Sequence, residues 1–236
     1  LDAANGYVLT SLGAGAGSEA VALYRTLDGG ANWTRIYVND PTVEGAGDSL
    51  PLSGQKIGMY FLDVNRCWVG GAIPMDGFTY FYATADGGVT WTQQVLALPP
   101  GFETSMTEIG APRFFNASDG ILQVRLIAGV PSTVFFVTFD GGLTWGRTFP
   151  INAYGRHSFA SVLDAFLWDG GATLYFSRDS GLTWNAVTPN INITDTMMSM
   201  QFVNSSTGWA LTGDADNHHS LYVTRDGGTT WTALVP

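Results

Sequence analysis

An eight-residue pattern occurs five times in this chain of 236 residues and constrains its fold more than any other feature. The pattern reads Ser or Thr, any residue, Asp, then Gly-Gly in four of the five copies, two variable residues and Trp. The copies lie at residues 26–33, 84–91, 138–145, 177–184 and 224–231. Their aspartates are 58, 54, 39 and 47 residues apart, which is typical of a repeat whose turn is fixed while its loops vary in length.

The residue types of this pattern suit a tight chain reversal. Glycine adopts the positive φ angles that other residues resist, and an Asp carboxylate can accept hydrogen bonds from the backbone N–H groups of the turn. The Trp begins the returning strand, and we expect its ring to be buried between neighbouring repeat units. In the fourth copy Ser180 replaces the first Gly, which predicts a strained or differently shaped turn. We therefore assign a structural role to ten residues, namely Asp28, Trp33, Asp86, Trp91, Asp140, Trp145, Asp179, Trp184, Asp226 and Trp231.

Short β-rich segments surround each copy and predict four antiparallel strands per repeat unit. In the second unit these segments are residues 57–61, 67–70, 78–83 and 92–96, and a helical period persists nowhere in the sequence. A four-stranded unit that recurs five times is typical of an all-β fold, the β-propeller, in which stacked blades bury one another's faces. We expect a single propeller domain over 1–236 with blades at approximately 1–40, 55–98, 108–151, 156–189 and 196–236.

The first unit differs from the others. Residues 1–9 align with 203–211, so the first unit begins at the tail of its innermost strand. Two arrangements follow: a five-bladed ring with one thin blade, which we favour, or a segment of a larger propeller.

The five copies resemble the Asp-box, or BNR, repeat of sialidase-like propellers. Similar repeats occur in sortilin-type receptors, xyloglucan hydrolases and photosystem II stability/assembly factor-like proteins, and the last group is the most similar in its Gly-Trp strand and Thr-x-Asp-Gly-Gly-x-Thr-Trp turn. The resemblance covers nearly the whole chain and is specific for fold rather than for activity. It implies that the Asp-box turns lie on the face opposite the usual ligand site.

Composition excludes several classes of protein. The hydrophobic fraction of 45% is too high for a disordered chain, and the net charge of −10 disfavours nucleic acid and anionic lipid as partners. The sequence contains no apolar run of about 20 residues, so we expect no direct membrane insertion. Low charge, a single lysine and abundant Thr, Asn and Gly favour an extracytoplasmic location, whether secreted, periplasmic or at the cell surface. Cys67, the only cysteine, is expected to be a buried and inert thiol.

The expected ligand face consists of the loops that join the second strand to the third and each unit to the next. These loops are residues 13–19, 71–78, 127–132, 168–171 and 213–219, with 39–55, 98–108, 149–156 and 189–196 between units. Carboxylates next to aromatic residues suit sugar binding and glycoside hydrolysis. The candidate ligand residues on this face are Glu44, Asp76, Phe78, Glu103, Glu108, Trp168, Asp214 and Asp216.

We assign no catalytic residues. Sialidase chemistry, in the family that this chain resembles, requires three arginines that hold a carboxylate, a Tyr–Glu pair and an acidic Asp. Arg25, Arg178 and Arg225 lie inside or just before Asp boxes, on the wrong face, and no glutamate has a recognisable nucleophile setting. The main hypothesis is therefore a non-catalytic module that binds a protein or glycan, or acts as a scaffold. The alternatives are a glycoside hydrolase that uses loop carboxylates, and a structural segment of a larger cell-surface or filament protein or assembly.

Residues 214–219 are the best local candidate for a cation site. Asp214-Ala-Asp216-Asn217 resembles the opening of a calcium loop, but the Gly and the closing Glu of that motif are missing. We expect a solvated polar loop, with no metal and no cofactor, and calcium as the alternative.

Overall fold

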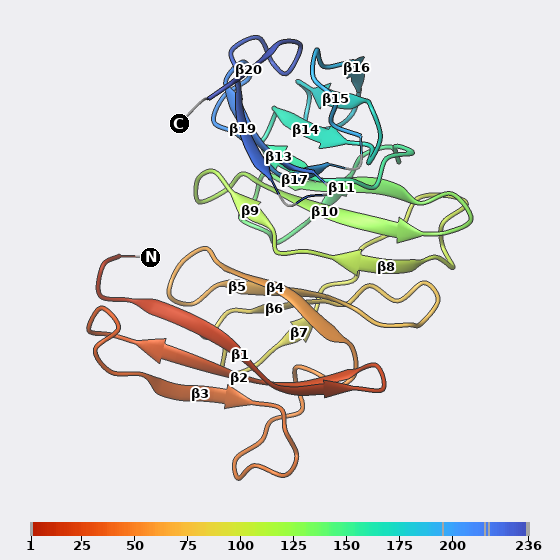
Figure 1. The fold of residues 1–236 in the computed structure, drawn as a ribbon. Coiled ribbons are helices and arrows are strands. Elements are labelled where there is room, and N and C mark those ends of the chain that lie inside the picture. Colours follow the sequence, from red (N-terminus) through yellow and green to blue (C-terminus); the bar gives the residue numbers. More distant parts are fainter. Residues whose placement is uncertain (1, 195, 215, 217, 235–236) are drawn as a thin grey trace. The chain divides into compact units, whose positions relative to one another are not determined.

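The computed structural model describes residues 2–194, 196–214, 216 and 218–234. Within these ranges the regular secondary structure consists of β-strands alone (Figure 1). The predicted all-β fold is confirmed. None of the described segments forms a long apolar helix that could cross a bilayer. The chain divides into two compact units, Leu1–Ala117 with Leu122–Ala128 (unit 1) and Ser118–Ile121 with Gly129–Pro236 (unit 2).

Unit 1 contains antiparallel strands from the first three repeats (Figure 1). Its strands are β1 (Gly6–Gly15), β2 (Ser18–Thr26), β3 (Thr34–Val38), β4 (Gln55–Phe61), β5 (Cys67–Ala72), β6 (Phe81–Thr84), β7 (Thr92–Gln93), β8 (Met106–Ile109), β9 (Arg113–Phe114) and most of β10 (Gly120–Ile127). The first repeat forms a sheet in the order β1-β2-β3, and the second repeat has the order β4-β5-β6-β7. Strand β8 pairs with β10 and, through Glu108 and Ala72, with β5.

Unit 2 contains two complete four-stranded sheets and the last strands of the third repeat. Its strands are β11 (Ser132–Thr138), β12 (Gly146–Arg147), β13 (His157–Phe159), β14 (Ala165–Trp168), β15 (Leu174–Ser177), β16 (Asn185–Val187), β17 (Met197–Phe202), β18 (Gly208–Gly213), β19 (His219–Thr224) and β20 (Trp231–Ala233). The two sheets have the orders β13-β14-β15-β16 and β17-β18-β19-β20, in which chain neighbours are also sheet neighbours.

The third repeat has two short strands before β10, the four-residue β8 and the two-residue β9. Gly110 and Pro112 separate the two strands, and proline interrupts pairing because it lacks a backbone N–H group.

The Asp-box turns have the hydrogen bonds that their residue types predict. In the second copy, Thr84 Oγ1 donates to Asp86 Oδ1 at 2.7 Å and accepts from Gly88 N at 3.0 Å. Asp86 Oδ1 accepts from Thr90 N at 2.9 Å, and Trp91 Nε1 donates to the Gly88 carbonyl at 3.1 Å. The bond from the leading Ser or Thr hydroxyl to the Asp carboxylate recurs in the other four copies. Each turn is therefore closed by its own side chains.

The fourth copy is strained, as the sequence predicts. Ser180 has a φ of 64°, close to the 70° of Gly29 and the 76° of Gly227 at the same position of other copies. For a residue with a Cβ atom this conformation costs about 1–2 kcal/mol. The fourth turn thus has the same shape as the others but a higher conformational free energy, which the four copies with glycine at this position do not have.

Two of the Asp-box tryptophans, Trp91 and Trp184, pack on an aromatic ring of the repeat before their own. Trp91 lies edge-on to Tyr37, with ring centroids 6.5 Å apart, and Trp184 lies 5.2 Å from Phe135. The prediction that all five rings are buried is confirmed for Trp91 and Trp231, which are 5% and 3% exposed. It is wrong for Trp33, which is 43% exposed, while Trp145 and Trp184 are half-buried. Trp33 makes the same indole hydrogen bond within its own turn, so its exposure depends on the packing around the turn rather than on the turn itself.

Each unit has its own aromatic core. In unit 1 the core joins the first two sheets and includes Leu23, Val69 and Cys67. Cys67 is fully buried, and burial raises the pKa of its thiol, so the predicted inert thiol is confirmed. In unit 2 the rings of Phe166 and Phe202 stack 3.5 Å apart at an interplanar angle of 5°.

Candidate functional site

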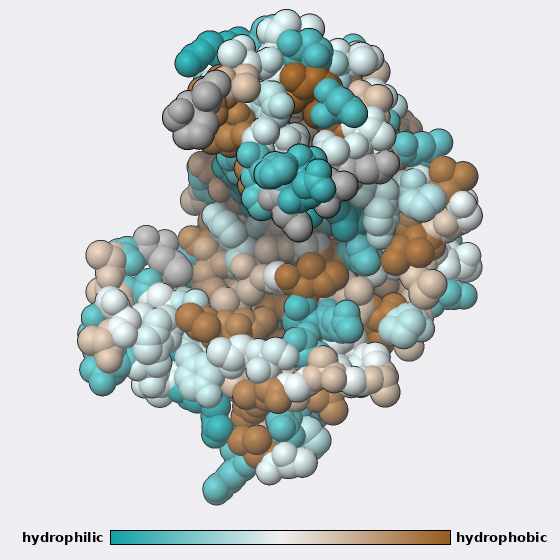
Figure 2. All heavy atoms as spheres, in the orientation of Figure 1, coloured by the Kyte–Doolittle hydropathy of each residue, from teal (hydrophilic) through white to brown (hydrophobic). Residues whose placement is uncertain are grey.

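Exposed apolar residues alone do not identify a site in this molecule. Large hydrophobic side chains are exposed at many positions, including Leu12, Val95 and Leu143, and Figure 2 shows hydrophobic residues at the surface next to hydrophilic ones. Singly exposed apolar residues are normal on protein surfaces. A binding site requires in addition a hollow with well-placed polar groups.

Unit 1 has such a hollow on its expected ligand face, with a volume of about 270 Å³. We call it the Glu108 hollow. It is lined by Gly17, Gln55, Ala72, Ile73, Pro74, Met106, Thr107, Glu108 and Ile127. These residues come from the turn between β1 and β2, the start of β4, the end of β5 and the loop after it, strand β8, and the end of β10. Three successive repeats therefore contribute to one concave surface.

One ion pair supplies the charge of this hollow. Glu108 Oε2 accepts a hydrogen bond from Arg125 Nη1 at 3.4 Å, and both side chains are about one-third exposed. The pair is cross-strand, because Arg125 of β10 lies opposite Glu108 of β8. A partly exposed pair of this kind contributes little to stability, but it offers both a donor and an acceptor to a ligand.

Lys56, the only lysine, fixes the loop beside the Glu108 hollow. Its ammonium donates to backbone carbonyls, among them Glu19 O at 2.9 Å, Pro51 O at 2.7 Å and Gly54 O at 2.9 Å. It also lies 5.3 Å from the centre of the Tyr80 ring. Burial lowers the pKa of Lys56, and the Glu19 carboxylate opposes that shift. The Lys56 ammonium thereby joins residues 51–54 to Glu19 at the start of β2.

The predicted ligand residues of unit 1 only partly converge. Glu108 lines the hollow, whereas Glu44, Asp76 and Glu103 are exposed on loops outside its lining. The loops that carry Asp76 and Glu103 are adjacent, because Gly77 N donates to Ser105 O at 3.1 Å.

The aromatic candidates do not present open rings. Phe78 is half-buried and packs against Tyr80, with ring centroids 6.5 Å apart. In unit 2, Trp168 is only 8% exposed and its Nε1 donates to the Gly171 carbonyl at 2.7 Å. A buried ring such as that of Trp168 is not available to stack on a ligand.

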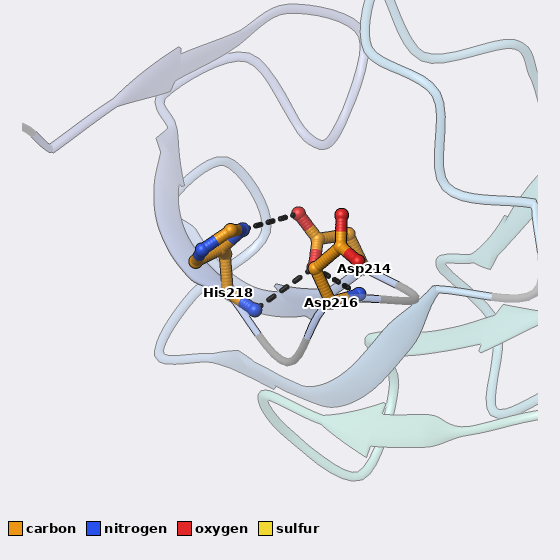
Figure 3. A group of neighbouring side chains, drawn as sticks. All are labelled: Asp214, Asp216 and His218. Atoms are coloured by element: carbon orange, nitrogen blue, oxygen red, sulfur yellow. Dashed lines mark hydrogen bonds and ion pairs between the residues drawn. The ribbon is translucent and has the colours of Figure 1, made fainter.

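Asp214, Asp216 and His218 form the cluster that sequence analysis considered for calcium (Figure 3). All three are exposed, and one ligand atom from each lies within 4.8 Å of the others. Asp214 Oδ1 accepts from the backbone N–H groups of Asp216 and His218, and its Oδ2 lies 3.1 Å from His218 Nδ1. These bonds lower the pKa of Asp214, led by the bond from the His218 backbone. They close a polar turn, and Asn217 lies outside the described residues.

Comparison with known proteins agrees with the fold. The family model described as BNR/Asp-box repeat matches residues 222–233, which include the fifth Asp box. No curated protein matches the chain. Among solved structures, YCF48 from Cyanidioschyzon merolae is 17% identical, with 93% of this chain and 70% of that chain covered and a TM-score of 0.56.

Two glycan-acting enzymes are similar in structure as well. The Niastella koreensis GH74 enzyme is 16% identical, with 98% of this chain and 36% of that chain covered and a TM-score of 0.57. Trypanosoma rangeli sialidase in complex with the inhibitor DANA is 13% identical, with 96% and 46% covered and a TM-score of 0.52. This chain thus spans about a third of the GH74 enzyme and less than half of the sialidase.

These comparisons confirm the predicted resemblance. The chain is an all-β protein with Asp-box repeats, and it is similar to YCF48, GH74 and sialidase β-propeller proteins. At such low identities the likeness concerns the fold, and it carries no catalytic residue across.

Sequence reasoning missed Lys56, Pro74 and Met106. Lys56 was noted only as the sole lysine, and no local pattern indicates that its ammonium meets several carbonyls. Pro74 and Met106 are 32 residues apart and meet at the Glu108 hollow only through loop packing.

Proposed function

We propose that this chain is a non-catalytic binding module, and that the Glu108 hollow receives an apolar side chain of an extended protein segment. The observation that carries the proposal is the composition of the hollow, in which Ile73, Pro74, Met106 and Ile127 form an aliphatic surface around one charged group. Apolar walls with a few convergent polar groups are typical of binding sites. The Glu108–Arg125 pair beside them supplies a donor and an acceptor for the main chain of a bound segment.

The lining supports binding rather than glycoside hydrolysis. Hydrolysis of a glycoside ordinarily needs two carboxyl groups about 5–10 Å apart across the bond that is cleaved. Among the described residues that line the hollow, Glu108 is the single carboxylate, and it is paired with Arg125.

The lining also supports a protein ligand rather than a glycan. Sugar recognition commonly uses an aromatic ring with an open face, and the two aromatic candidates, Phe78 and Trp168, are half-buried and buried. Aliphatic walls suit a side chain such as Leu, Ile or Met.

We also propose that the protein works outside the cytoplasm. The thiol of Cys67 is fully buried, so an oxidising compartment would leave it unchanged. Secretion is tested by locating the native protein in fractionated cells of its source; recovery only from the cytosol would contradict this part of the proposal.

The binding proposal is tested by selecting peptides from a random 15-residue display library on the full chain and measuring their affinity by calorimetry. Pro74→Asp and Ile127→Asp should each weaken a selected peptide at least tenfold, because a carboxylate would be buried against an apolar side chain. Val95→Asp is the matched control, since Val95 is 78% exposed and lies outside the hollow. Unchanged affinity in both hollow variants would refute the site. Turnover of an aryl glycoside that Asp76→Asn or Glu103→Gln abolishes would refute a non-catalytic role.

A further inference from the structure

A second hollow lies on the Asp-box side of unit 2, away from the expected ligand loops. Its volume is about 400 Å³, within the usual range for small-molecule sites. We call it the Arg147 hollow. It is lined by Val137, Phe139, Asp140, Thr144, Gly146, Arg147, Thr148, Ser180 and Leu182, which come from the third Asp box, strand β12 and the fourth Asp box. Val137, Phe139 and Leu182 give it apolar walls.

Two polar groups in this hollow have no partner. Arg147 is exposed, and the described part of the chain supplies no hydrogen bond, ion pair or ring contact to its guanidinium. Ser180 is only 7% exposed, and its backbone N–H donates to Leu163 O, but its hydroxyl is bonded to no described residue. Both groups can therefore donate hydrogen bonds to a bound molecule.

The remaining charged group is already satisfied. Asp140 accepts hydrogen bonds from the Thr138 hydroxyl at 2.7 Å and from Thr144 N at 3.0 Å. Its pKa is lowered to about 2, chiefly by the hydrogen bond from the Thr144 side chain. Asp140 therefore has little capacity left for a ligand, whereas the guanidinium of Arg147 can donate up to about five hydrogen bonds. What the hollow lacks is an acceptor, preferably an anionic one.

Ser180 also departs from the repeat in a way that folding does not require. The equivalent positions 29, 87, 141 and 227 are glycines with similar φ angles, so glycine would form this turn without strain. The strained residue adds only a hydroxyl group and a Cβ atom to the turn, and Ser180 is one of the residues that line the hollow. Strain that local structure does not need is typical of functional positions.

We propose that the Arg147 hollow binds a small carboxylate with an apolar or aromatic body, and that Arg147 and Ser180 hold its carboxylate. The body of the ligand would lie against Val137, Phe139 and Leu182. A carboxylate suits this pair of donors because the planar guanidinium can donate two parallel hydrogen bonds to its oxygens while the hydroxyl donates a third. This site is independent of the Glu108 hollow.

The test is an NMR titration of the full, ¹⁵N-labelled chain with 4-phenylbutyrate, with 4-phenylbutanol as the uncharged comparison. The carboxylate should bind at least tenfold more tightly than the alcohol and shift the amide signals of Gly146 and Ser180. Arg147→Gln should weaken its binding at least tenfold. The matched control is Arg225→Gln, which removes an exposed arginine from the fifth Asp box, at the position that Phe139 occupies in the third.

Ser180 allows a test that separates binding from folding. Ser180→Ala removes only the hydroxyl and should weaken binding threefold to tenfold. Ser180→Gly should weaken binding to the same extent while it raises the melting temperature, because it relieves the positive φ. Equal binding of acid and alcohol, or unchanged binding in Arg147→Gln or in both Ser180 variants, would overturn the proposal.

Discussion

Replacing Trp91 by Ala should destabilise the protein about twice as much as replacing Trp33 by Ala. The two residues hold the same place in the first and second Asp boxes, and both belong to unit 1. Their indole N–H groups make the same bond, at 3.0 Å to Gly30 O for Trp33 and at 3.1 Å to Gly88 O for Trp91. Both variants lose this bond, which is exposed at Trp33 and buried at Trp91, so the difference between them measures the burial of the whole indole.

The magnitudes follow from burial. A buried aromatic residue removes about 150–250 Å² from water, and Trp→Ala in a core costs about 3–5 kcal/mol. Trp91 is 5% exposed and should reach this range, whereas Trp33 is 43% exposed and buries roughly three-fifths as much area. Loss of Trp33 also leaves no enclosed cavity, so we expect a cost of about 1–2.5 kcal/mol.

Urea unfolding followed by far-UV circular dichroism measures both costs, since removal of a tryptophan alters fluorescence. Hydrogen exchange at the β2 amides of residues 21–23 gives a second measurement confined to unit 1. Trp→Phe at each position is the control that keeps an aromatic ring. Equal losses for the two alanine variants would show that Trp33 is covered in solution and would refute the reasoning.

Three other perturbations test the turns and the loop beside the Glu108 hollow. The pKa of Asp28 is lowered to about 2, chiefly because the Asn32 backbone donates a hydrogen bond to it, and the pKa of Asp140 is lowered to about 2 as well. Because these folded-state pKa values lie below the unfolded-state value, the two carboxylates stabilise the fold above pH 4 and lose this contribution as the pH falls. The urea midpoint should therefore decrease between pH 4 and pH 2, and it should decrease less steeply in Asp140→Asn. Lys56→Met should lower the free energy of unfolding by about 1–3 kcal/mol, because several carbonyls lose their donor, and an unchanged melting temperature would contradict this. Gly88→Ala should lower the free energy of unfolding by about 1–3 kcal/mol more than Gly101→Ala. Both glycines have positive φ, but only at Gly88 would an added Cβ overlap Leu23. Equal losses in chemical denaturation would be inconsistent with that packing.

The expected ligand face was only partly predictable. Glu108 was identified from its place in a loop between repeats, and it lines a hollow. Trp168 was identified by the same reasoning, but it is buried because its ring packs in the core of unit 2. Position in a loop indicates which face a residue can reach, whereas burial depends on which strands pack over it.

The five turns and their strands could be derived from the sequence because their chemistry is local. The bonds that close each Asp box join residues two to four positions apart, so the residue types alone specify them. The strain at Ser180 was predictable for the same reason, since the positive φ belongs to the turn itself.

Contacts between distant parts of the chain were decided only by the tertiary structure. Arg147 and Ser180 are 33 residues apart, and nothing in either local sequence indicates that they line one hollow. The exposure of Trp33 likewise depends on a neighbouring repeat rather than on its own turn, which has the same form as the turn of Trp91. Residue types determine the hydrogen bonds that form within a few positions of the chain, whereas the packing of the sheets determines which polar groups stay available for a ligand.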